Sequence, residues 1–113
     1  MRPKGSKYGS KNSWHYVWNP YTKSATARDI SIINGSDHDY DTFRKMLLGN
    51  KTVVSWMKAN GWGIINELTK EILGRTKGTG RHFHFGPDNW ARRTWNAWLS
   101  NPNIPVTKAI WYE

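Results

Sequence analysis

The sequence contains no cysteine, so disulfide bridges, thiolate metal sites and cysteine nucleophiles are all excluded. It also lacks any long apolar run, and no apolar signal-peptide core follows Met1, so we expect no membrane partner. Acidic residues are scarce, with 8 Asp and Glu against 17 Lys and Arg. The resulting formal charge of +9 is typical of proteins that bind nucleic acid.

Aromatic residues, by contrast, are abundant: 14% of the 113 residues are aromatic, and 8 residues are tryptophan. Because tryptophan is large and carries an N–H group, some of these rings are expected at a binding surface. Residues 1–13 combine basic residues with glycine and serine, which predicts a flexible basic arm. Residues 14–113 are long enough for a single globular domain.

Hydrophobic periodicity and turn residues predict a mixture of short strands and helices. The clearest predicted helix covers 62–73, where Ile64, Leu68 and Ile72 recur at four-residue spacing. Residues 24–29 are ambiguous but compatible with a helix. The remaining predictions are strands at 14–18, 30–33, 82–85 and 106–112, and helices at 41–48, 51–59 and 89–99. This order favours an α+β fold, a small antiparallel sheet of three to four strands with three to four helices packed on it.

Strict alternation in His82-Phe83-His84-Phe85 places both phenylalanines on one face of the strand and both histidines on the other. If the phenylalanines face the core, the two imidazoles stand side by side on the outer face, which a cleft would make accessible. Two such groups can supply the general base and general acid of RNA cleavage without a metal or other cofactor. We therefore predict His82 and His84 as catalytic residues, with His15 or His38 as a third member.

Basic residues surround this pair in the sequence. Arg81 directly precedes it and is predicted to stabilise the charge of the transition state. The predicted substrate-binding residues flank the pair on both sides, namely Arg75, Lys77, Trp90, Arg92 and Arg93.

Two alternatives use the same residues differently. In the first, His82 and His84 bind a metal together with Asp37, His38 or Asp39, because His-x-His on a strand directs two nitrogens to one side. In the second, the protein is a non-catalytic binder in which exposed rings stack on the bases of single-stranded nucleic acid. Trp90 is the ring most expected to be exposed, because it falls outside the apolar stripe of its predicted helix.

The triplet His82-Phe83-His84 resembles the His-hydrophobic-His signature of replication-initiator and relaxase endonucleases. That resemblance implies a divalent metal bound by the pair and a tyrosine nucleophile. The initiator type requires a downstream tyrosine with a lysine one turn later, whereas Tyr112 is the only tyrosine downstream and Glu113 alone follows it. The relaxase type uses an upstream tyrosine, for which Tyr16, Tyr21 and Tyr40 are present.

The region from Gly74 onward, with its Gly-Arg-His-x-His-x-Gly pattern, resembles the C-terminal toxin modules of bacterial polymorphic toxins of the Rhs and contact-dependent inhibition types. This resemblance implies a nuclease, often a ribonuclease, exported or delivered into target cells and acting in the bacterial cytoplasm. It also implies an acidic immunity protein as partner. The predicted function is accordingly a hydrolase that cleaves nucleic acid, a metal-independent ribonuclease acting as a toxin module on RNA.

Overall fold

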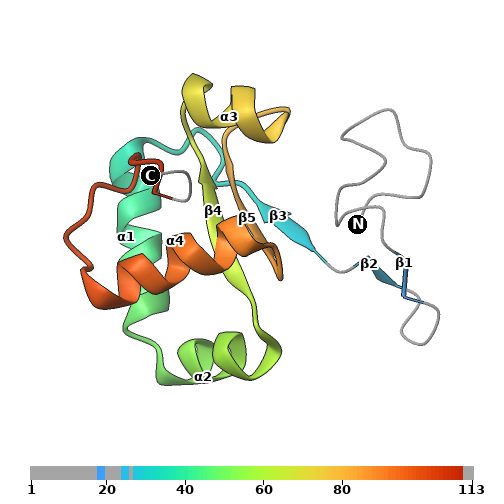
Figure 1. Cartoon of the computed structure of the whole chain (residues 1–113). Coiled ribbons are helices and arrows are strands. Elements are labelled where there is room, and N and C mark those ends of the chain that lie inside the picture. The colour runs from blue at the N-terminus through green and yellow to red at the C-terminus, as the bar shows by residue number, and fades with distance from the viewer. Residues whose placement is uncertain (1–17, 20–23, 26, 111–113) are drawn as a thin grey trace.

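The structure is a computed structural model that describes residues 18–19, 24–25 and 27–110 (Figure 1). Within these residues the chain forms four helices, a two-stranded sheet and a three-stranded antiparallel sheet, which confirms the predicted α+β class. In chain order the elements are β1 (Trp18–Asn19), β2 (Ser24–Ala25), β3 (Arg28–Ile30), α1 (Asp37–Leu48), α2 (Lys51–Asn60), β4 (Gly63–Glu67), α3 (Lys70–Thr76), β5 (His82–Gly86) and α4 (Asn89–Ser100). No helix of this described part is long and apolar enough to cross a membrane.

The strand with the two histidines, β5, lies at the centre of the three-stranded sheet, between β3 and β4. Its pairing sets Asp29 and Ile65 on either side of His84, and Glu67 beside His82. Directly opposite residues of antiparallel strands point to the same side of a sheet. One face of the sheet therefore carries both histidines together with Asp29, Ile65 and Glu67.

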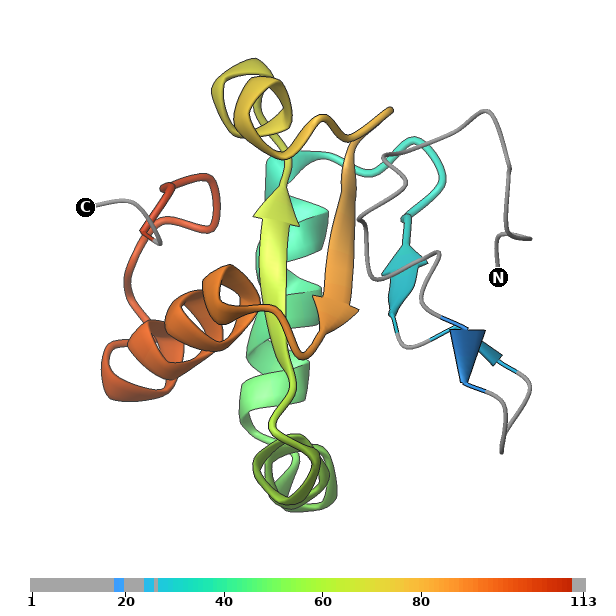
Figure 2. The same cartoon turned by 45° about the vertical axis from the view of Figure 1, so that its right-hand side comes forward.

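The opposite face of the sheet holds the main hydrophobic core. Phe83 is fully buried there, and its ring centroid lies 5.2 Å from that of Tyr40 and 5.8 Å from that of Trp98. Figure 2 shows α1, which carries Tyr40, running behind β4 and β5. Phe85 belongs to the same cluster, so the prediction that the phenylalanines of β5 face the core is confirmed.

The helix predicted over 62–73 is wrong. Gly63–Glu67 form β4, every residue of which is buried, and α3 begins only at Lys70, after the N-cap Thr69. Ile64 enters the main core, whereas Ile65 joins a second cluster on the histidine face. A strand buried on both faces shows no alternation, and its short apolar run imitates one side of a helix. Pairing with β5 therefore overrides the local periodicity.

The closing strand predicted at 106–112 is also not formed within the described residues, which end at 110. The side-chain amide of Asn66 instead donates hydrogen bonds to the carbonyls of Val106, at 2.7 Å, and Lys108, at 2.8 Å. A single buried side chain thus holds this segment against the sheet without a strand ladder.

The elements predicted before residue 34 either differ from the structure or lie outside the described residues. Helix over 24–29 is wrong, because Ser24–Ala25 and Arg28–Ile30 are strands. The strand predicted at 30–33 is displaced, since β3 ends at Ile30. Of the strand predicted at 14–18, only Trp18 lies within the described residues, and the arm at 1–13 lies outside them.

Three helices match the predicted positions closely, but their caps and faces differ in detail. Helix α1 begins at Asp37 rather than Asp41, because Ser36 and Asp39 form a capping box at its N-terminus. Met46 of this helix is 68% exposed, while Arg44 is buried with its guanidinium over the Trp98 ring. In α4 the apolar stripe is formed by Ala91, Trp95 and Trp98, which are buried, whereas Leu99 is exposed.

Candidate acid–histidine site

The side chains of His82 and His84 share one face of β5, as the alternation predicts, but that face is not open to solvent. Each residue is only 5% exposed. The imidazoles are therefore not exposed as expected, and the site reaches the surface only through the neighbouring carboxylates of Asp29 and Asp88, whose side chains are 20% and 23% exposed. Buried polar groups require partners, and here most of the partners are carboxylates.

Three carboxylates from three different elements meet the two imidazoles. Asp29 comes from β3, Glu67 from the end of β4, and Asp88 from the residue before α4. Nε2 of His82 lies 3.2 Å from Oε1 of Glu67 and 3.4 Å from Oδ2 of Asp29. Nδ1 of His84 lies 3.3 Å from Oδ1 of Asp29 and 3.9 Å from Oε1 of Glu67. We call these five residues the acid–histidine site.

Asp88 occupies the N-cap position of α4, as its place in the sequence predicts, yet its side chain makes no capping hydrogen bond. Its Oδ1 lies instead 2.8 Å from Nε2 of His84. A capping hydrogen bond typically contributes about 1 kcal/mol to stability. The helix forgoes this contribution, and the carboxylate binds the imidazole.

The carboxylates determine the protonation of His84. Burial lowers the pKa of this residue, but its hydrogen bonds to Asp29 and Asp88 outweigh burial and raise the pKa from 6.5 to about 9. In the absence of a metal ion, His84 is therefore an imidazolium at neutral pH, with a carboxylate at each ring nitrogen.

The loop between α3 and β5 is built closely around Glu67. The hydroxyl of Thr76 donates a hydrogen bond of 2.5 Å to Oε2 of Glu67. A Cβ atom at Gly78 would lie 2.3 Å from the same oxygen, which is closer than any non-bonded contact allows. A side chain at position 78 would therefore displace either the loop or the Glu67 carboxylate. Oε2 is held by the loop, and Oε1 faces the imidazoles.

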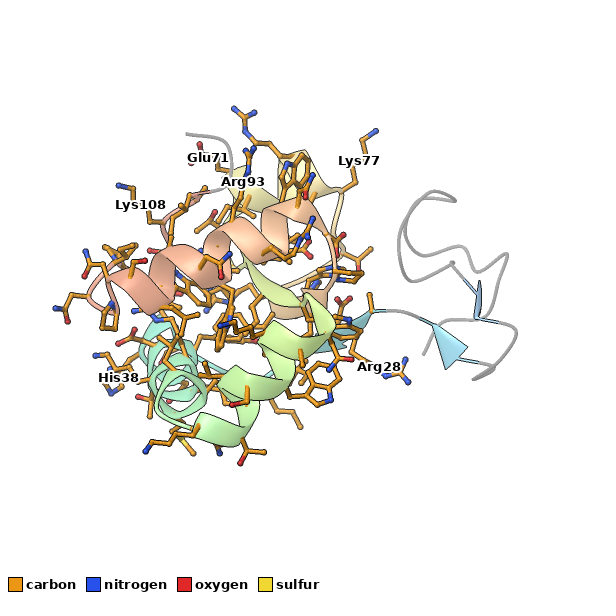
Figure 3. All side chains as sticks on the ribbon, turned by 60° about the horizontal axis from the view of Figure 1, so that its bottom comes forward. Arg28, His38, Glu71, Lys77, Arg93 and Lys108 are labelled. Carbon is orange, nitrogen blue, oxygen red and sulfur yellow. The ribbon has the colours of Figure 1, made fainter. Side chains whose placement is uncertain are left out.

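The predicted substrate-binding residues lie on the two helices that adjoin this site. Arg75 and Lys77 are exposed at the end of α3, next to Thr76, and Arg92 and Arg93 are exposed on α4, which follows Asp88. Figure 3 shows Lys77 and Arg93 extending toward the same side of the molecule. Trp90, in the first turn of α4, is 40% exposed, as predicted.

Arg81 is not directed toward the acid–histidine site. Its guanidinium forms an ion pair with Asp37 at 2.9 Å, donates a hydrogen bond to the Leu68 carbonyl and lies over the Tyr40 ring. Tyr40 packs against Phe83, so Arg81 lies with the α1 side of the sheet. Its ion pair with Asp37 thus links the start of β5 to α1.

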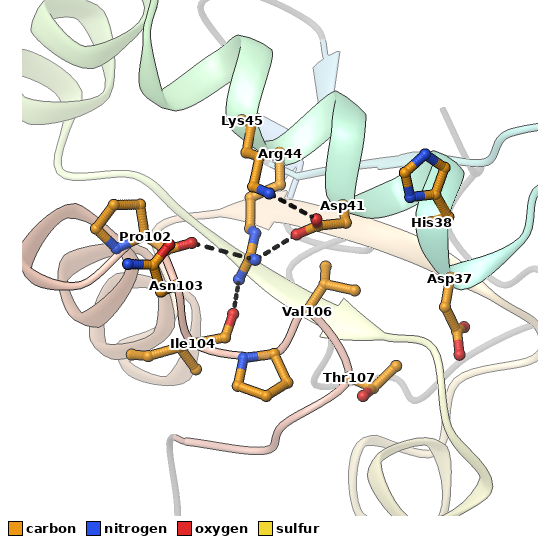
Figure 4. Close-up of a pocket in the computed structure, with 11 residues that line it drawn as sticks. Asp37, His38, Asp41, Arg44, Lys45, Pro102, Asn103, Ile104, Val106 and Thr107 are labelled. Carbon is orange, nitrogen blue, oxygen red and sulfur yellow. Dashed lines mark hydrogen bonds and ion pairs between the residues drawn. The ribbon is translucent and has the colours of Figure 1, made fainter.

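The residues offered as a third catalytic member or as further metal ligands are not brought to the pair. His38 is exposed on α1, where it lines a separate cavity of about 310 Å³ together with Asp41 and Arg44 (Figure 4). The carboxylate of Asp39 accepts a hydrogen bond from the backbone of Ser36. His15 lies outside the described residues.

Sequence reasoning assigned no chemical role to Asp29, Glu67 or Asp88. Glu67 lies within the helix predicted over 62–73, where the structure has a strand, and Asp29 lies in the ambiguous segment 24–29. One sequence feature does point to Glu67, because it closely follows the apolar residues Ile64 and Ile65. A carboxylate at the end of a buried strand needs a partner or a function.

The site offers carboxylate oxygens and an imidazole nitrogen as ligands for a cation. The ligand atoms of Asp29, Glu67 and His84 all lie within 4.8 Å of one another. In comparisons with known proteins, no family model, no curated protein and no solved structure matched this chain. The chemistry of the site is therefore considered from its own residues.

Proposed function

We propose that the protein is a nuclease that cleaves phosphodiester bonds of nucleic acid, RNA in the first place, at the acid–histidine site. The observation that supports this most is the position of the site in the charge distribution. A chain of net charge +9 gathers three of its 8 acidic residues around two buried histidines. The helices next to that cluster carry exposed arginines and lysines on their outer surfaces.

The exposed cations suit a polyanionic substrate. Lys77 at the end of α3 and Arg92 and Arg93 on α4 would contact phosphates on either side of the bond that is cut. Trp90 would stack on a base between them, a contact that is typically worth about 1–3 kcal/mol in single-stranded complexes. Binding would thus be electrostatic and would tolerate different sequences.

The imidazoles and carboxylates would supply the proton transfers that phosphodiester cleavage requires. The sequence assigns these transfers to His82 and His84 as an acid–base pair. In the structure His84 has a carboxylate at each ring nitrogen, whereas the contacts of His82 are made through Nε2. We therefore assign proton transfer to His82 and give His84 a role in holding the site together.

Cleavage of labelled oligonucleotides tests this proposal. Purified protein is incubated with single-stranded RNA, single-stranded DNA and duplexes, each carrying a fluorophore at one end. His82→Ala and Glu67→Gln should each reduce the rate of RNA cleavage at least about 100-fold, the usual effect of losing a proton-transfer group. The matched variants His38→Ala and Glu71→Gln, at exposed positions of α1 and α3, should stay within about threefold of wild type. Equal rates in site and control variants would refute the proposal.

A second candidate function is binding of single-stranded nucleic acid without cleavage, and the exposure of Trp90 favours it. The two functions differ in turnover. A binder would quench tryptophan fluorescence on addition of RNA, with affinity falling steeply with salt, and would leave the RNA intact. A nuclease would shorten the RNA under the same conditions.

The toxin role and the acidic immunity partner are part of the same proposal. The exposed surface over α3 and α4 is positively charged, and an acidic protein would complement that charge. Induced expression in bacteria should stop growth for the wild type and not for Glu67→Gln. Normal growth with folded wild-type protein present would remove the toxin role and leave the nuclease proposal standing.

A further inference from the structure

The acid–histidine site has an arrangement that proton transfer alone does not require. Nε2 of His82 lies within 3.4 Å of two carboxylates, those of Asp29 and Glu67. One N–H group can donate a well-formed hydrogen bond to only one of these oxygens. The same two carboxylates also approach Nδ1 of His84. Two anions and two imidazole nitrogens thus converge on one buried point.

Asp88 determines which nitrogen of His84 faces this point. Its Oδ1 lies 2.8 Å from Nε2, so it accepts the proton of that nitrogen. A neutral His84 then carries its lone pair on Nδ1, directed toward Asp29 and Glu67. A carboxylate that holds one nitrogen of a histidine while the other nitrogen binds a metal is a recurring arrangement of metal sites.

Glu67 is oriented in a similar way. Thr76 and the loop at Gly78 occupy the surroundings of Oε2, while Oε1 faces His82 and His84. One oxygen of the carboxylate is thus held by the protein, and the other is presented to the point of convergence. A glycine at position 78 leaves the space for this carboxylate, and a glycine at position 86 does the same for Asp88, whose Oδ1 would lie 2.6 Å from a Cβ atom there.

We propose that this point is a binding site for one divalent metal ion, with Asp29, Glu67 and His84 as its protein ligands and Asp88 as the residue that orients His84. The three ligand atoms already lie within 4.8 Å of one another, a span that small adjustments of side chains can close around one ion. Two carboxylate oxygens and one imidazole nitrogen suit zinc or manganese better than the hard, oxygen-preferring calcium ion. His82 lies beside both carboxylates, with its Nε2 within 3.4 Å of each.

The metal would also account for a difficulty of the nuclease proposal. Three carboxylates repel a phosphodiester, and a divalent cation among them offsets most of their negative charge. Three protein ligands leave a coordination position for a phosphate oxygen, which the ion would polarise as a Lewis acid. This catalytic part of the inference rests on the proposed function, whereas metal binding itself does not.

Direct metal binding tests the inference without any activity measurement. The protein is stripped with EDTA, dialysed and titrated with Zn²⁺ or Mn²⁺ in a calorimeter, and thermal unfolding is followed in parallel. Wild type should bind one ion per chain, and its Tm should rise, because a ligand that binds only the folded state stabilises it. Asp29→Asn and His84→Ala should each lower the affinity at least tenfold. Glu71→Gln and His38→Ala should bind as wild type does.

Two further measurements keep the outcome clear. Circular dichroism of each metal-free variant establishes that it is folded, and Asp88→Asn provides a mild variant in which all three ligands remain. Asp88→Asn should weaken binding about 10–100-fold, the usual effect of losing such an orienting residue. Absence of binding to folded wild type, or equal affinity in Asp29→Asn and wild type, would overturn the metal site.

The two proposals fail in different ways. RNA cleavage that persists in EDTA in a protein that binds no metal would remove the metal site and retain the nuclease with its metal-free histidine pair. Stoichiometric metal binding without cleavage of any nucleic acid would retain the metal site and remove the nuclease.

Discussion

At the scale of single residues, Asp88 shows most clearly how this chain departs from local rules. An aspartate before a helix ordinarily caps it, yet here the carboxylate binds Nε2 of His84 and the cap is not formed. Gly78 shows the converse. It looks like an ordinary flexible glycine of a loop, yet a side chain there would collide with Glu67. Both residues are explained by contacts with the site and not by their own secondary structure.

The pKa of His84 predicts how the stability of the metal-free protein changes with pH. Its folded-state pKa of about 9 exceeds the ordinary value of 6.5, so the folded state holds this proton more tightly than the unfolded state does. The stabilisation is complete below pH 6.5, falls as pH rises and is lost above pH 9. In EDTA, the free energy of unfolding should therefore decrease by a few kcal/mol between these limits.

Urea denaturation at several pH values measures this decrease. Asp88→Asn should flatten the profile, because it removes one of the three carboxylates that raise the pKa of His84. A wild-type profile without slope between pH 6.5 and pH 9 would contradict the assignment.

Gly78→Ala tests the packing around Glu67. The new methyl group would lie 2.3 Å from Oε2 and must displace either the loop or the carboxylate, so we expect a loss of about 1–3 kcal/mol in stability and weaker metal binding. Gly74→Ala is the matched control in α3, where a Cβ atom meets nothing within 4 Å. Alanine in a helix should be neutral or stabilising by up to about 1 kcal/mol. If both variants behave alike, the loop is not built around Glu67.

At the scale of elements, the exchange of a predicted helix for β4 is what creates the site. As a helix, residues 62–73 would have carried Glu67 on the solvent side; as a strand, they set it beside His82 in the sheet. The same change also places β4 against α4, and the two elements pack closely together. Strand pairing and helix packing are both contacts between distant parts of the chain, and neither is encoded in local periodicity.

Gly63→Ala measures the importance of this strand–helix contact. A Cβ atom at Gly63 would lie 2.0 Å from the backbone oxygen of Ala91, so α4 must move away from β4. We expect a destabilisation of more than about 2 kcal/mol in urea denaturation, since the blocked atom belongs to the backbone of a helix. Gly80→Ala, where the added carbon meets nothing within 4 Å, should change stability by less than about 0.5 kcal/mol. Similar losses in both variants would show that the packing of α4 tolerates displacement.

At the scale of the whole molecule, the net charge is strongly positive, although three of the 8 acidic residues gather at the acid–histidine site. The formal charge of +9 predicts long-range attraction to polyanions and a strong dependence of binding on salt. If the surface over α3 and α4 is the binding face, cations there should matter more than cations on α2, which lies at the far end of the molecule from α3 (Figure 1).

Binding of RNA by a cleavage-deficient Glu67→Gln background tests this face. Arg92→Ala, Arg93→Ala and Lys77→Ala should each weaken binding and reduce the slope of log affinity against log salt by roughly 0.7–1 per lost phosphate contact. Lys58→Ala, an exposed lysine in the last turn of α2, is the matched control and should leave the slope unchanged. Equal changes at Lys58 would mean that net charge, and no particular face, attracts the nucleic acid.

The sequence by itself determined the α+β class, the approximate positions of α1, α2 and α4, and the separation of His82 and His84 from Phe83 and Phe85 across one strand. These follow from local periodicity, because side chains alternate across a strand and recur every three to four residues on a helix. Only the tertiary structure decided which acidic residues meet the histidines. Asp29 and His84 are 55 residues apart in the chain, and their contact depends on the pairing of β3 with β5. The pattern predicted a pair of imidazoles; the sheet joined the carboxylates of Asp29 and Glu67 to it, and the start of α4 added that of Asp88.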